Sequence, residues 1–105
     1  MIELNVVGKR VLIEGHGTRD EPFVVHGIQN DPALVAVAEE TMIDHWMGQG
    51  NWEMLKTRLE HGPRGRVLAI LTVLTTDEED KPIKGDIWFD VTEAFAQNPS
   101  RKIAL

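Results

Sequence analysis

Four histidines are the side chains of this sequence best suited to metal or acid–base chemistry: His16, His26, His45 and His61. None belongs to a zinc-binding pair, because the chain has no H-E-x-x-H, no His-x-His and no cysteine. His16 and His26 could still converge with Asp20 across one polar loop, since imidazole and carboxylate both bind zinc. We expect no metal and no cofactor, and leave the convergence of these three residues open.

His45 is also a candidate for acid–base chemistry, because the same segment carries three carboxylates, Glu39, Glu40 and Asp44. A histidine and a carboxylate that face each other can exchange a proton with a substrate. Asp44 and His45 are adjacent, however, and adjacent helical residues point about 100° apart. The spacing favours a solvent-exposed acidic stripe, with His45 at the edge of the buried face. A catalytic pair would need Asp86 or Asp90 to reach His45 across a pocket between helix and sheet.

Other catalytic and phosphate-binding motifs are absent from the sequence. Serine occurs only at Ser100, so no nucleophile-elbow motif is present, and the lack of cysteine excludes a thiolate nucleophile. The glycines form neither G-x-G-x-x-G nor G-x-x-x-x-G-K. These absences favour a domain that is not an enzyme, although they do not decide the question.

Basic side chains gather at residues 56–66, where Trp52 would share a strand face with Lys56 and Arg58. The four are Lys56, Arg58, Arg64 and Arg66. Basic residues beside an aromatic ring can bind single-stranded nucleic acid. The chain carries 11 basic and 17 acidic side chains, a net charge of −6 that disfavours this role. Charge balance against nearby glutamates explains the cluster, as would docking of the acidic first half of a second subunit.

The three tryptophans, Trp46, Trp52 and Trp88, point to an interface, where this residue type is enriched. Core packing accounts for Trp46, and in part for Trp52. Trp88 would lie on the polar face of its strand, beside Lys84. We therefore predict a symmetric homodimer, or contact with a partner protein, through a surface that includes Trp88, Lys84 and Trp52. Coverage of Trp88 within one chain, by the N-terminal hairpin or by the C-terminal tail, is the competing interpretation.

The elements that must position these residues begin with a helix over 32–47. Asp31 is suited to cap it, Pro32 suits its first position, and Gly48 suits its end. Alternation predicts a hairpin of 2–7 and 10–14 around Gly8-Lys9, in which Val6 faces Val11. A short strand could follow at 23–26.

The second half of the chain predicts three strands that form an antiparallel meander. Residues 52–60 fit either a strand or a helix, and we favour the strand. Residues 66–75 are apolar on both faces, which predicts the most buried strand, and 83–91 alternate. Asp90 could then cap a short helix at 92–97, with Glu93 as its capping-box partner.

Length and composition limit the number of domains and the fold class. The 105 residues, 42% of them hydrophobic, predict one globular domain over 1–105. Its fold class is α+β, with one long helix on an antiparallel sheet of four or five strands. This layout is similar in outline to cystatin-like and NTF2-like domains.

The sequence also favours a general kind of role and a location. No apolar stretch approaches the roughly 20 residues of a membrane helix. The first residues lack the pattern of a signal peptide, so we expect a cytoplasmic protein. We expect it to act through protein contacts, and the alternative is a ligand or enzyme pocket that uses His45 with Asp86 or Asp90.

Overall fold

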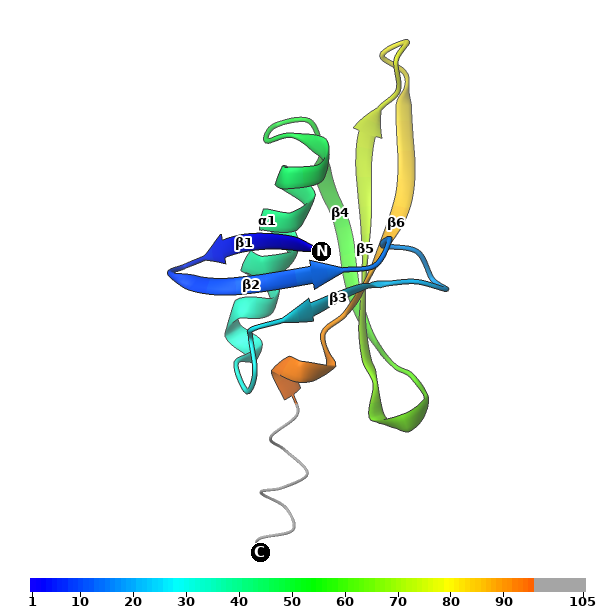
Figure 1. The fold of residues 1–105 in the computed structure, drawn as a ribbon. Coiled ribbons are helices and arrows are strands. Elements are labelled where there is room, and N and C mark those ends of the chain that lie inside the picture. The colour runs from blue at the N-terminus through cyan, green and yellow to red at the C-terminus, as the bar shows by residue number, and fades with distance from the viewer. Residues whose placement is uncertain (96–105) are drawn as a thin grey trace, which may run out of the picture.

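The computed structural model describes residues 1–95 and shows one α-helix packed against a six-stranded mixed sheet (Figure 1). The strand order across the sheet is β1-β2-β3-β6-β5-β4. The elements are β1 (Ile2–Val6), β2 (Lys9–Glu14), β3 (Phe23–His26), η1 (Pro32–Leu34), α1 (Val35–Met47), β4 (Glu53–His61), η2 (Pro63–Gly65), β5 (Val67–Thr76), β6 (Pro82–Asp90) and η3 (Thr92–Phe95).

The sheet differs from the expected antiparallel sheet of four or five strands. It has six strands, and the pairing of β3 with β6 is parallel, although every other pairing is antiparallel. The parallel ladder joins Phe23 to Phe89 and Val24 to Asp90. These partners are more than sixty residues apart in the sequence, so local alternation carries no information about their pairing.

The first hairpin forms where predicted, but its register was predicted wrongly. The turn is Val7-Gly8 rather than Gly8-Lys9, and Leu4 faces Val11. Both turn residues have positive φ, 50° at Val7 and 81° at Gly8, which is the type I′ pattern favoured in two-residue hairpins. The side-chain oxygen of Asn5 accepts a hydrogen bond from the Gly8 N–H at 2.9 Å. A β-branched residue at positive φ is uncommon, so the sequence pattern pointed to the neighbouring pair.

The helix occupies the predicted residues, with η1 forming its first turn and α1 the rest. Asp31 precedes the helix but does not cap it through its side chain, so that prediction was wrong. The Asp31 carboxylate instead lies 3.6 Å from the Lys9 ammonium. At the other end Gly48 adopts a φ of 93°, and its N–H donates to the Asp44 carbonyl at 2.8 Å. No helix within residues 1–95 is long and apolar enough to cross a membrane.

The core lies between α1 and the face of the sheet that α1 covers. Six of the ten β5 residues are buried, which confirms that 67–76 is the most buried strand. Val67, Ala69, Leu71 and Val73 of β5 belong to the core together with residues of α1 such as Met42 and Ile43. Residues 53–61 form a strand, as favoured, and a bulge between Met54 and Lys56 shifts their register. After the bulge, Thr57 and Leu59 face Leu71 and Ala69.

The chain leaves the sheet through Asp90 into the short helix η3. Asp90 accepts hydrogen bonds from the N–H and the hydroxyl of Thr92, at 3.1 and 2.6 Å. Glu93 does not complete the predicted capping box, because its carboxylate accepts from the Gly27 N–H at 2.7 Å. The structure places η3 at 92–95, and the last two residues of the predicted helix, 96 and 97, lie outside the described residues.

Candidate functional site

A cleft of about 480 Å³ opens between α1 and β4, and we call it the α1–β4 cleft. In Figure 1 the helix and β4 run side by side along this part of the molecule. The walls come from η1, α1, β4, β5 and η3. The residues that line the cleft are Pro32, Val35, Ala36, Glu39, Glu40, Met54, Thr57, Leu59, Ala69 and Phe95. Most of these side chains are apolar, and no basic side chain is among those the structure describes there.

Glu39 is the exceptional residue of this cleft. It is only 5% exposed, and its Oε2 atom is buried without a hydrogen-bond partner among residues 1–95. The sequence interpretation placed Glu39 in a solvent-exposed stripe, and the structure corrects this. Glu39 lies four residues after Val35 and four before the buried Ile43, so it shares their face of the helix. The spacing alone indicated that Glu39 is buried, but a glutamate on a helix is usually expected to be exposed.

The environment of Glu39 changes its ionisation. Burial raises the pKa of Glu39 from 4.5 to about 7, and the nearby Glu40 carboxylate adds to the effect. Near neutral pH the side chain is therefore divided between a carboxylate, which only accepts hydrogen bonds, and a carboxylic acid, which can also donate one. Either form can bind a polar group inside an otherwise apolar cleft.

The outer wall of the cleft is an edge strand. β4 ends the strand order, so its outer side has no neighbouring strand among the described residues. Two of its leucines are well exposed, Leu55 at 44% and Leu59 at 56%. An edge strand presents unpaired backbone N–H and C=O groups that can pair with another chain. The α1–β4 side of the molecule thus combines an open backbone edge with an apolar cleft.

The structure does not bring His45 together with Asp86 or Asp90. Asp86 accepts a hydrogen bond from the Thr72 hydroxyl at 2.6 Å, and Asp90 lies 3.1 Å from the Arg66 guanidinium. Both aspartates alternate along β6 with core residues that face α1, so they lie on the opposite face of the sheet from the helix. His45 is exposed, at a depression that His16 and Trp46 also line.

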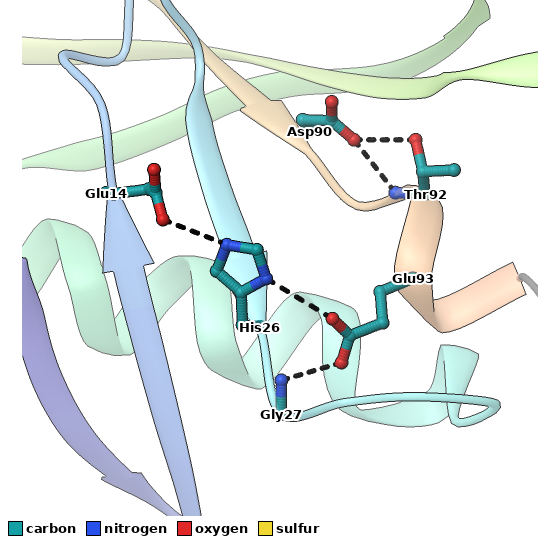
Figure 2. Close-up of polar contacts among 6 residues, drawn as sticks. All are labelled: Glu14, His26, Gly27, Asp90, Thr92 and Glu93. Carbon is teal, nitrogen blue, oxygen red and sulfur yellow. Dashed lines mark hydrogen bonds and ion pairs between the residues drawn. The ribbon is translucent and has the colours of Figure 1, made fainter. Parts of the chain in front are cut away.

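His16, His26 and Asp20 do not form a ligand set either. His16 contacts the Glu21 carboxylate at 2.5 Å. His26 lies between two glutamates, with Nε2 3.2 Å from Glu14 and Nδ1 3.4 Å from Glu93, as Figure 2 shows. Across residues 1–95, no three side chains of the histidine, cysteine, aspartate and glutamate types are placed to hold a metal ion.

The three residues predicted for an interface lie in two places. Trp88 is partly buried, its backbone N–H donates to the Gly17 carbonyl at 2.9 Å, and the Arg19 guanidinium lies 6.0 Å from its ring centre. The same chain therefore covers part of Trp88, but through the loop between β2 and β3 rather than through the predicted N-terminal hairpin, and the C-terminal tail lies outside the described residues. Trp52 packs against the core at the other side of the sheet and donates to Asp44 at 2.8 Å.

The four basic residues predicted to cluster also lie in more than one place. Lys56 and Arg58 line a second open depression together with Lys84, Thr72, Gly85 and Asp86. Arg66 pairs with Asp90, and Arg64 belongs to the turn η2. Lys84 thus shares a surface with two of the four predicted basic residues, on the face of the sheet away from α1.

Comparison with known proteins gives no match: no family model, no curated protein and no solved structure is significantly similar to this chain. The function of the α1–β4 side is therefore argued from its geometry alone.

Proposed function

We propose that this protein acts through protein contacts, as a symmetric homodimer joined at the outer edge of β4. The observation that carries the proposal is the outer edge of β4, which has no neighbouring strand among residues 1–95; it is nine residues long, with Leu55 and Leu59 exposed on it. Addition of a strand to such an edge satisfies its backbone hydrogen bonds and covers apolar side chains. Two-fold dimers are the commonest assemblies, and they need only one self-complementary surface.

The charges of β4 select one register for this pairing. A two-fold axis perpendicular to the sheet places residues of the same face opposite each other. A centre at Thr57 would set Lys56 against Arg58, and a centre at Arg58 or Glu60 would set that charge against its own copy. A centre at Leu59 sets Arg58 against Glu60 twice and packs Leu59 on its copy. We therefore place the axis at Leu59, beyond the bulge that interrupts the strand at residues 54–56.

This edge is a better candidate for the interface than the surface around Trp88. Arg19 and the backbone of Gly17 already contact Trp88 within the chain. Trp52 already has a hydrogen-bond partner in Asp44. Leu59, by contrast, is more than half exposed, on a strand whose outer edge has no neighbour in the described part of the chain. Substitution of Trp88 by alanine should accordingly leave the dimer intact.

Single-cysteine cross-linking tests the proposed register, because the chain contains no cysteine of its own. Leu59→Cys should oxidise to a covalent dimer, since residues directly opposite in an antiparallel pair have Cβ atoms about 5 Å apart. The matched control is Leu55→Cys, another exposed leucine of β4. In this register its two copies are eight residues apart along the strand, about 27 Å, and should not cross-link. Equal cross-linking of both variants would refute the register.

Charge reversal tests the association itself. Sedimentation should show a dimer for the unmodified protein at about 100 μM and a shift toward monomer for Arg58→Glu or Glu60→Arg, each of which sets like charges opposite each other. The double variant should restore the dimer, because the opposite charges are then exchanged across the axis. An unmodified protein that sediments as a monomer at this concentration would contradict the proposal.

A further inference from the structure

The α1–β4 cleft has the size and lining of a site for a small molecule. Its volume of about 480 Å³ falls within the range of roughly 300 to 1,000 Å³ that is usual for ligand pockets. Apolar side chains from the helix, from β4 and from η3 form most of its wall, among them Val35, Met54, Leu59 and Phe95. Ligand pockets of this kind combine an apolar lining with a few polar groups that fix orientation.

One polar group of this cleft, the carboxyl of Glu39, has an oxygen that no group in residues 1–95 satisfies. Oε2 of Glu39 is buried and has no hydrogen-bond partner there. Buried polar groups in folded proteins almost always have such a partner, because an unpaired one costs free energy. Glu39 lines the cleft, so its unpaired oxygen lies beside it, where a molecule that enters the cleft could donate a hydrogen bond to it.

We propose that the α1–β4 cleft binds a small organic ammonium, a primary amine attached to a compact apolar group, with Glu39 as its counter-ion. Three features favour a cation over a neutral or anionic ligand. An ionised carboxylate only accepts hydrogen bonds, and the ammonium group only donates them. Glu40 lines the same cleft and adds negative charge, while no Lys or Arg is among the residues of 1–95 that line it. The apolar wall then holds the uncharged part of the molecule.

This site is distinct from the proposed dimer contact, although Leu59 takes part in both. The ammonium interacts with a residue of the helix, whereas strand pairing uses the backbone of β4. Cross-linking at Leu59 reports the dimer, and signals from α1 report the ligand. Either proposal can therefore fail without the other.

A nuclear magnetic resonance titration with three probes of similar size tests the ligand class. The probes are 2-phenylethylamine, the neutral 2-phenylethanol and the anionic 3-phenylpropanoate, added at pH 8 to ¹⁵N-labelled full-length protein. We expect 2-phenylethylamine to shift the amides of Val35, Ala36 and Thr57 in a saturable way. The alcohol should bind at least about tenfold more weakly, because it can donate a hydrogen bond but carries no positive charge to pair with the carboxylate. The anion should not bind.

Three variants locate the interaction. Glu39→Gln should weaken 2-phenylethylamine about tenfold or more and leave the weak binding of 2-phenylethanol unchanged. The matched control, Glu40→Gln, removes an exposed carboxylate of the same cleft and should change the affinity by a few-fold at most. Ala36→Phe should abolish binding of both probes by filling the cleft, without any change at Glu39.

Each contrary result overturns the proposal. Equal affinity for the amine and the alcohol would show an apolar pocket without charge recognition. Unchanged amine affinity in Glu39→Gln would place the cation elsewhere, and preferred binding of the anion would reverse the assigned ligand class. The absence of saturable shifts with any probe would refute the site. Amide spectra and thermal unfolding of each variant establish that it is folded.

Discussion

Glu93 and Glu39 lie in opposite environments in this fold, one hydrogen-bonded and the other not fully so among residues 1–95. Glu93, at the junction of β3 and η3, accepts a hydrogen bond from the Gly27 N–H at 2.7 Å and lies 3.4 Å from His26 (Figure 2). His26 in turn contacts Glu14 at 3.2 Å. Glu39, in the α1–β4 cleft, is more deeply buried and has an oxygen with no partner among residues 1–95.

The difference between these two glutamates separates a carboxylate that stabilises the fold from one that is better suited to binding. The junction ties a loop and a strand to η3 with paired polar groups, which is how carboxylates normally stabilise a fold. An oxygen of Glu39 without a partner among residues 1–95 is expected to lower stability, and stabilising replacements at such positions are usually easy to find. A destabilising group at a cleft is therefore better explained by binding than by folding.

The largest expected effect is a pH-dependent loss of stability that originates at Glu39. Its pKa is about 7 in the folded protein, against 4.5 as the ordinary value. The folded state thus holds its proton over a pH range where the unfolded chain has released it, so the free energy of unfolding falls as pH rises. We expect this group to lower it by about 2 to 3 kcal/mol between pH 5 and pH 8.

Urea unfolding at the two pH values measures the effect, with Glu39→Gln as the comparison. In Glu39→Gln the free energy of unfolding should no longer show this fall between the two pH values. In Glu40→Gln the fall should remain, because Glu40 is exposed. The same slope in the original protein and in Glu39→Gln would show that the Glu39 carboxyl is solvated in the folded state.

A second prediction concerns the hydrogen-bonded polar groups around η3. Thr92→Val should lower the free energy of unfolding by about 1 to 2 kcal/mol. The Thr92 hydroxyl accepts from the buried Val67 N–H at 2.9 Å and donates to Asp90 at 2.6 Å, and valine offers neither bond. Thr92→Ser, which keeps the hydroxyl, should lose less. Urea midpoints for the two variants at pH 7 provide the measurement, and equal losses would mean that the hydroxyl is not what matters.

A smaller effect is expected at Glu93. Glu93→Ala should destabilise by about 1 kcal/mol, because it removes the acceptor of the Gly27 N–H at a partly exposed position. Its sign should be opposite to that of Glu39→Gln at pH 8. Glu21→Ala, which removes the exposed partner of His16, is the control and should change stability by less than about 0.5 kcal/mol. Thermal unfolding at pH 8 checks all three, and a stabilising Glu93→Ala would remove the contrast between the two glutamates.

The helix and the strands of the second half could be predicted because their periodicity is local. Residues 32–47 repeat with the helical period, and 66–75 are apolar on both faces, so each pattern indicates its own structure. The parallel pairing of Phe23 with Phe89 is non-local and has no such signal. The hairpin register depended on Val7, which adopts a positive φ that its residue type disfavours.

The candidate site was harder to predict than the fold. A pocket between helix and sheet was one of the two hypotheses, but it was assigned to His45 with Asp86 or Asp90 on the strength of residue type. Those aspartates face away from the helix, and the cleft lies instead over β4. Glu39 lies at helical spacing from Val35, which packs against the core, and from the core residue Ile43, so its position and not its residue type indicated burial. Glutamates on helices are usually solvated, so Glu39 was expected to be exposed despite its spacing.

A direct titration of the Glu39 carboxyl is the sharpest test of its environment and of its proposed role. The carboxyl carbon can be followed by ¹³C nuclear magnetic resonance from pH 4 to pH 9 and assigned by its loss in Glu39→Gln. The free protein should give a midpoint near the pKa of about 7. Saturating 2-phenylethylamine should lower that midpoint, because a bound cation favours the ionised form. A midpoint near 4.5 that the amine does not move would contradict the account.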